Sequence, residues 1–150
     1  MERRKFLNLG MGAVALTVLP GTLMAEDHRA TKPNVWTAKK VEDAIKSMYG
    51  NKEIVKSNVK LTAPDVASNG GAVPVNVKSK VKAKTVSIFQ DANPEAAVIV
   101  FDINKNSIIN YDIKMKMKAS GTITVIVEGI DGKLYVATKE VNVALGGCEG

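Results

Sequence analysis

The sequence predicts an all-β fold: an immunoglobulin-like antiparallel β-sandwich with a short N-terminal helix and a flexible C-terminal arm. Val, Ile and Thr are plentiful whereas aromatic residues make up 5% of the chain, which favours strands. About seven short segments place apolar residues at every second position, and turn-forming clusters separate them. These segments are 59–61, 73–77, 86–88, 113–117, 123–127 and 141–145, together with a continuous apolar run, 96–101, which we interpret as a strand buried on both faces.

Local signals indicate one helix and one hairpin. Apolar residues recur at i, i+3, i+4 and i+7 from Val41 to Met48, so we expect a helix over residues 37–49 with Thr37 as its N-cap. Asp131-Gly132 is a two-residue turn signal between two strand-like segments, and it predicts a β-hairpin. Strands and helices do not alternate along the chain, so a parallel α/β sheet is not expected.

Residues 1–25 have the layout of a secretory signal, with a basic start, an apolar stretch and a small residue before Glu26. The stretch is too short, and too often interrupted by glycine, for a transmembrane helix. Arg3-Arg4-Lys5-Phe6-Leu7 resembles the twin-arginine signal, which directs the export of a folded protein. The alternative is an ordinary signal for unfolded export. We expect no membrane attachment once the signal is cleaved.

The rest of the chain divides into three parts by composition. Residues 26–36 are polar, contain Pro33 and predict a flexible lead-in. Residues 37–145 predict the β-sandwich domain with its N-terminal helix. Residues 146–150 predict a mobile arm, because two glycines follow the last alternating segment.

The net charge of +6 does not indicate nucleic-acid binding. The lysines are spread along strand-like segments as solvated faces, and no basic cluster is interleaved with aromatic residues that bases stack on. A mild positive charge suits small anions or acidic partner surfaces.

Most catalytic and metal sites are excluded by composition. The one histidine, His28, falls in the lead-in, where we expect it to be solvated, so a histidine triad, a multi-histidine metal site and a haem attachment motif are out of reach. Met115 and Met117 share one face of a predicted strand, where core packing is the ordinary use of methionine and a copper site is not expected. The sequence therefore predicts a protein that is not an enzyme and holds no cofactor.

The tail is the exception. Cys148 is the one cysteine of the chain, and it follows Gly146-Gly147 and precedes Glu149-Gly150. A cysteine kept for packing is expected within a buried strand, whereas three extended residues would project this one by about 10 Å. An incidental exposed thiol and an intermolecular disulfide are the alternatives, but idle thiols are liabilities in an oxidising compartment.

At this tail the sequence resembles the SoxY family, sulfur carriers of the periplasmic thiosulfate-oxidising system, whose members end in Gly-Gly-Cys-Gly-Gly. The resemblance extends to residues 61–75, which are similar to a family segment with a Pro-acidic start, an Asn-Gly turn and a valine-rich strand. Asn93-Pro94 and the closing hairpin also fit. Glu149 stands where the family usually has glycine, so we expect a carboxylate beside the thiol to raise the pKa of Cys148 slightly.

The resemblance implies a covalent sulfur carrier. A SoxAX-type haem enzyme would conjugate thiosulfate to Cys148, a SoxB-type manganese hydrolase would release sulfate, and a SoxCD-type sulfur dehydrogenase, where present, would oxidise the remaining sulfur. The arm residues Gly146, Gly147, Glu149 and Gly150 would swing the cargo between them. The resemblance also implies a heterodimer with a SoxZ-like subunit, and export to the periplasm by the twin-arginine route.

Two rival interpretations remain at this stage. A structural or adhesive periplasmic immunoglobulin-like domain with an incidental thiol predicts no covalent adduct. A ubiquitin-like thiocarboxylate carrier uses a terminal Gly-Gly, whereas here three residues follow that pair.

Overall fold

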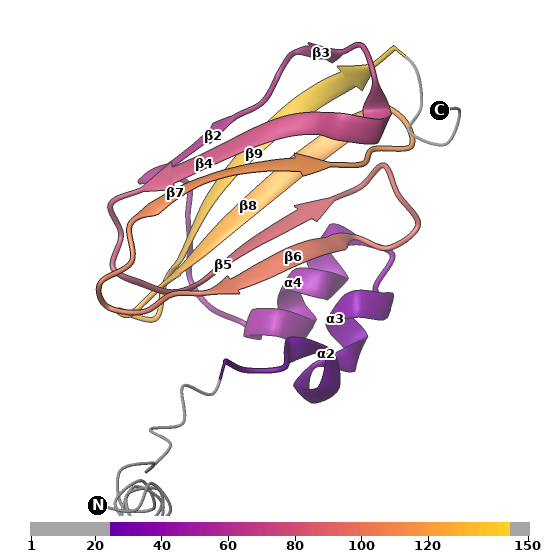
Figure 1. Ribbon diagram of the computed structural model, residues 1–150. Coiled ribbons are helices and arrows are strands. Elements are labelled where there is room, and N and C mark those ends of the chain that lie inside the picture. The colour runs from indigo at the N-terminus through magenta and orange to yellow at the C-terminus, as the bar shows by residue number, and fades with distance from the viewer. Residues whose placement is uncertain (1–24, 145–150) are drawn as a thin grey trace, which may run out of the picture.

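The computed structural model describes residues 25–144, in which two β-sheets and a group of short helices form three layers (Figure 1). The helices are α2 (His28–Thr31), α3 (Pro33–Thr37) and α4 (Val41–Tyr49), with a 3-10 turn, η2 (Gly70–Ala72). The strands are β1 (Ile54–Val55), β2 (Val59–Thr62), β3 (Val66–Ala67), β4 (Val73–Ser79), β5 (Ala83–Gln90), β6 (Ala97–Asp102), β7 (Ile109–Met115), β8 (Gly121–Gly129) and β9 (Leu134–Val143).

The larger sheet has the strand order β1-β9-β8-β5-β6, with β3 also paired to β9, and the smaller sheet has the order β2-β4-β7. The long neighbouring strands pair antiparallel, while the two-residue strands β1 and β3 pair parallel to β9. The predicted all-β class is confirmed, and the two facing sheets are consistent with an immunoglobulin-like sandwich.

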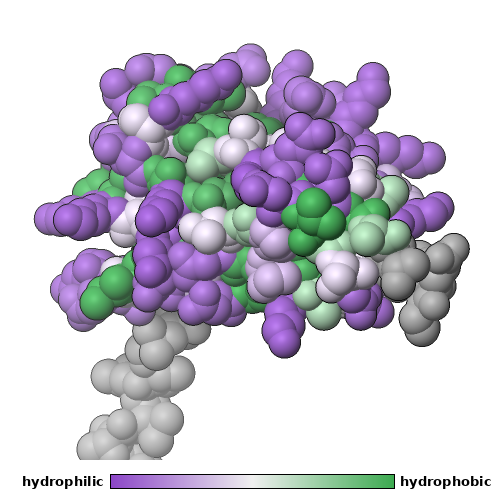
Figure 2. All heavy atoms as spheres, turned by 90° about the horizontal axis from the view of Figure 1, so that it is seen from above, coloured by the Kyte–Doolittle hydropathy of each residue, from purple (hydrophilic) through white to green (hydrophobic). Residues whose placement is uncertain are grey.

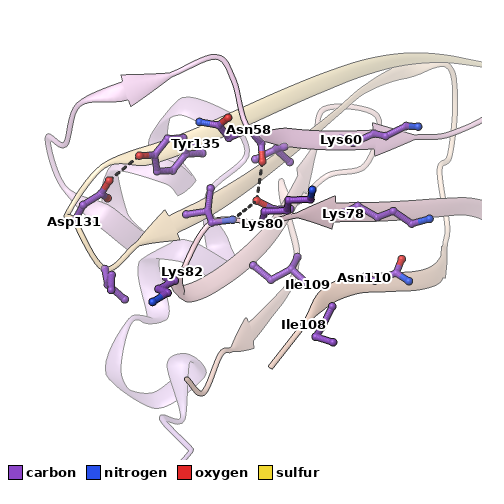
Figure 3. Close-up of a pocket in the computed structure, with 14 residues that line it drawn as sticks. Asn58, Lys60, Lys78, Lys80, Lys82, Ile108, Ile109, Asn110, Asp131 and Tyr135 are labelled. Atoms are coloured by element: carbon purple, nitrogen blue, oxygen red, sulfur yellow. Dashed lines mark hydrogen bonds between the residues drawn. The ribbon is translucent and has the colours of Figure 1, made fainter. Parts of the chain in front are cut away.

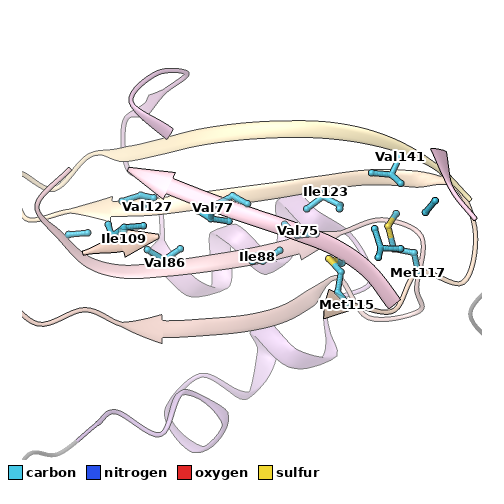
Figure 4. Packing of buried hydrophobic residues seen from close by; sticks show 14 residues of the cluster. Val75, Val77, Val86, Ile88, Ile109, Met115, Met117, Ile123, Val127 and Val141 are labelled. Carbon is cyan, nitrogen blue, oxygen red and sulfur yellow. The ribbon is translucent and has the colours of Figure 1, made fainter. Parts of the chain in front are cut away.

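The core between the sheets is built from the alternating residues that the sequence pattern predicts. Val75 and Val77 of β4 face Val86 and Ile88 of β5, all at most 2% exposed (Figure 4). Met115 and Met117 lie in the same cluster at 4% and 0% exposure, so the prediction that these methionines pack in the core is confirmed.

A second core lies between the larger sheet and the helices, which cover its outer face (Figure 1). Its fully buried members include Val35 of α3, Ala44 of α4 and Phe89 of β5. As a result β5 and β8, at the middle of the sheet, are buried on both faces. The same prediction for residues 96–101 is wrong: β6 is an edge strand, and its residues are only partly buried.

The predicted flexible lead-in is instead two short helices. Asp27 caps α2 by accepting hydrogen bonds from the amides of Arg29 and Ala30, and Pro33 occupies the first turn of α3, where its fixed φ favours a helix. The Arg29 guanidinium lies 4.2 Å from the centre of the Trp36 ring. The polar composition was misleading because these residues interact with one another and with the sheet.

The prediction that His28 is solvated is also wrong. Its side chain is 7% exposed, and Nε2 lies 2.8 Å from Oδ1 of Asp102 at the end of β6. Trp36 donates its indole N–H to the His28 carbonyl at 3.0 Å. These contacts join α2 and α3 to the edge of the larger sheet.

The predicted helix over 37–49 begins later than expected. α4 starts after Lys40, and Thr37 is the last residue of α3 rather than an N-cap. The C-terminal end is as predicted, since Gly50 adopts a φ of 69° and its amide bonds to the Lys46 carbonyl.

The predicted hairpin at Asp131-Gly132 is confirmed. Glu128 and Leu134 are paired across β8 and β9, and Gly132 has a φ of 85°, in the region that favours glycine. No helix within residues 25–144 is long and apolar enough to cross a membrane.

The end of β4, the start of β5 and the β8–β9 hairpin lie at one end of the sandwich, and the end of β9 lies at the other (Figure 1). Seen from above, hydrophobic patches are interrupted by hydrophilic side chains that project around the outline (Figure 2). Val66 of β3 is one of the exposed large apolar residues, at 62%.

Candidate functional site

The residues predicted to carry the chemistry, Cys148 and its neighbours Gly146, Gly147, Glu149 and Gly150, lie outside the described part of the chain. The described part that leads to them is the end of β9 together with Ala144, residues 142–144, which we call the tail root. The geometry of the site therefore begins with what holds the tail root.

Three backbone amides fix the tail root to two separate segments. Asn142 donates to the Asp65 carbonyl at 2.9 Å, and Ala144 donates to the Ala67 carbonyl at 2.9 Å. Between them, Val143 donates to the Ser120 hydroxyl oxygen at 2.9 Å. The chain is therefore held in place up to its last described residue.

An ion pair reinforces one side of the tail root. The ammonium group of Lys139 on β9 bonds to Oδ1 of Asp65, just before β3. This hydrogen bond, together with the positive charge, holds the pKa of the Asp65 carboxyl below its usual value. Asp65 thus holds β9 through its side chain as well as its carbonyl.

The segment 61–75, singled out in the sequence, forms the surroundings of the tail root. Asn69 accepts a hydrogen bond from the Gly71 amide at 2.7 Å. The Gly70 carbonyl accepts from the Met117 amide at 2.8 Å. The structure thus brings this segment beside the end of β9, a proximity that sequence reasoning did not predict.

Asn93 holds the chain just after β7. Its side-chain Nδ2 donates to the Lys116 carbonyl and its Oδ1 accepts from the Lys118 amide, each at 2.8 Å. Gln90, which is fully buried, positions Asn93 by accepting its amide hydrogen at 2.6 Å. The sequence indicated only a turn at Asn93-Pro94, because hydrogen bonds between distant segments leave no local pattern.

Three exposed lysines lie beside the backbone that Asn93 holds. Lys114, Lys116 and Lys118 are exposed, whereas Met115 and Met117 between them are buried in the core. We call these three residues the lysine row. The Asn93 side chain bonds to the backbone of Lys116 and Lys118, and the Met117 amide donates to the Gly70 carbonyl. These hydrogen bonds hold the backbone of the lysine row in place.

Two shallow hollows lie on either side of Lys114. One, of 570 Å³, is at the seam between the edge strands β6 and β7 and includes Asn93, Glu95 and Lys116. The other, of 510 Å³, lies on the outer face of the smaller sheet and includes Pro64 and Pro74. Both belong to the end of the sandwich that carries the tail root.

Among residues 25–144, no group of three or more His, Cys, Asp or Glu side chains is arranged to hold a metal ion. The described geometry therefore offers a fixed base for the tail, with three exposed lysines next to it.

A family model described as "Sulfur oxidation protein SoxY" matches residues 45–148. The chain belongs to the SoxY family. The match ends at Cys148, so it includes the cysteine and both segments that meet at the tail root.

A solved SoxY structure supports the same assignment. The sulfur carrier protein SoxY from Chlorobium limicola f. thiosulfatophilum is 34% identical, with a TM-score of 0.64, over 71% of this chain and 97% of that chain. A superoxide reductase (neelaredoxin) from Ignicoccus hospitalis has a TM-score of 0.52 and 17% identity, over 58% of this chain and 80% of that chain, so the likeness is one of fold alone. No curated protein matches the sequence.

The opposite end of this SoxY-family sandwich carries a separate hollow of 970 Å³ (Figure 3). It is lined by Lys60, Lys78, Lys80 and Lys82, and by the exposed Ile108. β9, whose ten residues rise by about 3.3 Å each, separates this hollow from the tail root. The hollow is therefore a surface distinct from the tail end.

Proposed function

We propose that this chain carries sulfur intermediates covalently on Cys148 in the periplasm and presents them to partner enzymes of sulfur oxidation. The observation that carries the proposal is that the SoxY match extends to Cys148, the one thiol of the chain. The similar Chlorobium protein is itself described as a sulfur carrier.

The tail root supports this role. A carrier needs a cargo group that reaches into a partner's cleft while its base remains in place. Hydrogen bonds to Asp65, Ser120 and Ala67 hold β9 to its last described residue, so residues 146–150 would form the arm. Cys148 lies four residues beyond Ala144, and four extended residues add about 13 Å of reach.

The proposed chemistry uses the thiolate of Cys148. Its sulfur and the outer sulfur of thiosulfate form an S–S bond, and the two electrons released pass to a SoxAX-type haem enzyme. Hydrolysis of the S–SO₃ bond by a SoxB-type manganese enzyme then releases sulfate and leaves a persulfide on Cys148. A SoxCD-type dehydrogenase would oxidise that remaining sulfur. The chain contributes the nucleophile and the reach, and the enzymes contribute the active sites.

A SoxZ-like subunit is the proposed permanent partner, in a heterodimer. Residues 1–25 would export the folded chain through the twin-arginine route, which allows a second folded subunit to travel with it. Co-purification of the two proteins as one species tests this part of the proposal.

The experiment for the carrier role is intact-mass measurement of the protein from thiosulfate-grown cells. We expect additions of about 32 Da for one sulfur and about 112 Da for a thiosulfate-derived group, both removed by reductant. The Cys148→Ser variant should show neither. Unmodified thiol under every growth condition would favour a structural or adhesive domain instead.

A second variant tests the position of the thiol. Cys148→Ser combined with Ser107→Cys keeps one exposed thiol but moves it to the β6–β7 loop, at the opposite end of the sandwich. We expect this double variant to react with a small maleimide but not to be loaded by the haem enzyme. Loading at residue 107 would show that the tail is not required.

A further inference from the structure

The lysine row is a positively charged feature next to the tail root. Lys114 lies near the end of β7, and Lys116 and Lys118 follow just after the strand ends; all three side chains are exposed. Within residues 25–144, their ammonium groups take part in no ion pair or side-chain hydrogen bond. The nearby carboxylates of Asp112 and Asp91 accept hydrogen bonds from Asn76 and from the Thr122 amide.

The row is fixed with respect to the tail root. Its backbone is held by three hydrogen bonds: Asn93 donates one to the Lys116 carbonyl and accepts one from the Lys118 amide, and the Met117 amide donates one to the Gly70 carbonyl. Ser120, two residues after Lys118, accepts the Val143 amide of the tail root. A surface that contacts the row is therefore set in a defined position relative to the point where the tail leaves the sandwich.

We propose that the lysine row docks on an acidic rim around the cleft of the enzyme that receives the tail. This inference rests on the proposed carrier function and names the contact surface that function requires. A tail that enters a cleft brings its base against the rim of that cleft, and the base carries three exposed cations. Complementary charge on the rim would guide and orient the encounter.

The spacing favours a protein surface over a small anion. The three lysines do not line one common hollow, as a site for a single sulfur oxyanion requires, because Lys118 lines neither of the two hollows beside Lys114. Carboxylates along a rim can meet such separate lysines one by one. The hollows of 570 and 510 Å³ on either side of Lys114 offer space for rim side chains. Glu95 lines the first of these hollows with Lys114 and Lys116, so the lining of that hollow carries a net charge of +1.

The test compares two charge-reversed triple variants of the full mature chain with its partner subunit. K114E/K116E/K118E changes the lysine row, and K60E/K78E/K82E makes the same change in net charge at the opposite hollow. The probe is the purified haem enzyme that conjugates thiosulfate to the chain. We expect the row variant to lose at least about tenfold in kcat/KM for loading, and the matched variant to stay within about twofold.

Salt supplies a second measurement. The loading rate of the native chain should fall as ionic strength rises, while that of the row variant should hardly change, because screening acts on the charges that the variant has lost. Equal losses in both triple variants would show that net charge alone matters, and no loss in the row variant would show that the enzyme does not contact the row. Either result overturns the proposal.

Two controls separate this inference from the carrier function itself. Binding of the Cys148→Ser chain to the haem enzyme measures docking without cargo chemistry, so a docking defect of the row variant in this background remains visible if Cys148 carries nothing. If Cys148 reacts with maleimide equally fast in the row variant and in the native chain, the row variant presents a normal thiol. If K114E/K116E/K118E does not fold, K114Q/K116Q/K118Q takes its place in the test. Loss of binding to thiosulfate alone, with docking intact, would assign the row to the small anion and overturn the acidic-rim proposal.

Discussion

The Asn93 side chain donates a hydrogen bond from Nδ2 to the carbonyl of Lys116 at 2.8 Å, across 23 positions of sequence. Its Oδ1 accepts from the Lys118 amide, so one amide group satisfies the backbone on both sides of Met117. Because Lys116 and Lys118 belong to the lysine row, the Asn93 side chain both stabilises the fold at this point and holds the proposed docking surface in place.

Replacing Asn93 by Ala should therefore lower the stability of the fold and weaken docking through the lysine row. The two lost hydrogen bonds are exposed, so water replaces them, and we expect the free energy of unfolding to fall by about 1–2 kcal/mol. Hydrogen exchange at the Lys118 amide should become faster, and loading by the haem enzyme should weaken. Denaturant unfolding and site-resolved exchange measure these effects.

Asn34→Ala is the matched control for this change. Asn34 lies exposed in α3, far in sequence from the row, and within the described chain its side chain makes no hydrogen bond. The control should leave unfolding, exchange at Lys118 and loading as in the native chain. Unchanged exchange at Lys118 in Asn93→Ala would show that this side chain does not hold the row.

Tyr49 connects the helices to the larger sheet by a buried polar network. Its hydroxyl lies 2.7 Å from Ser87 Oγ and 2.9 Å from Thr85 Oγ1, and Thr85 donates to Glu128 at 3.1 Å. Burial raises the pKa of Tyr49 from 10.0 to about 12, although the hydrogen bonds to Ser87 and Thr85 oppose the shift. The folded protein thus favours the neutral phenol.

This shift predicts a loss of stability at alkaline pH. Because the folded pKa is raised, the stabilisation from Tyr49 is complete below pH 10 and is lost as the pH rises through about 12. A shift of this size corresponds to roughly 3 kcal/mol at most. The free energy of unfolding should fall between these pH values, as urea titrations at several pH values will measure.

Tyr49→Phe removes the titrating group and is the comparison for this prediction. It should be destabilised at neutral pH by about 1–3 kcal/mol, since it leaves buried hydroxyls with fewer partners. The difference between the native chain and the variant should shrink from pH 10 to pH 12. A constant difference would mean that Tyr49 does not ionise in this range.

The strand pattern was predictable from the sequence wherever one face of a strand is buried and the other exposed. Val75 and Val77 of β4 and the Asp131-Gly132 hairpin follow the local rules of alternation and turn chemistry. The apolar run in β6 was misread because continuous hydrophobicity does not say whether a strand lies at the centre or the edge of a sheet.

The helical lead-in was missed for a different reason. The composition of residues 26–36 is polar, but His28 is buried by its contact with Asp102, which is 74 positions away. Long-range pairing of this kind has no local signal. The same holds for the tail root, where Asp65 and Ser120 meet β9 from two distant segments.

The final prediction concerns removal of the proposed arm, residues 146–150. Within the described chain, the last fully buried residue is Val141, and the tail root is held by hydrogen bonds that end at Ala144. If the arm adds nothing to this packing, its deletion should change the free energy of unfolding by no more than about 0.5 kcal/mol, as for surface changes in general. Thermal unfolding of the truncated and full chains measures this.

The same deletion should abolish thiosulfate-dependent turnover in a reconstituted system, because Cys148 is removed. Replacing Gly146 and Gly147 by proline keeps the thiol but fixes φ near −65° at two positions, so turnover should be intermediate and stability unchanged. A large loss of stability on truncation would mean that the tail packs against the sandwich, and a swinging arm would then be ruled out. Full turnover in the proline variant would mean that the conformational freedom of the two glycines is not needed for entry into the cleft.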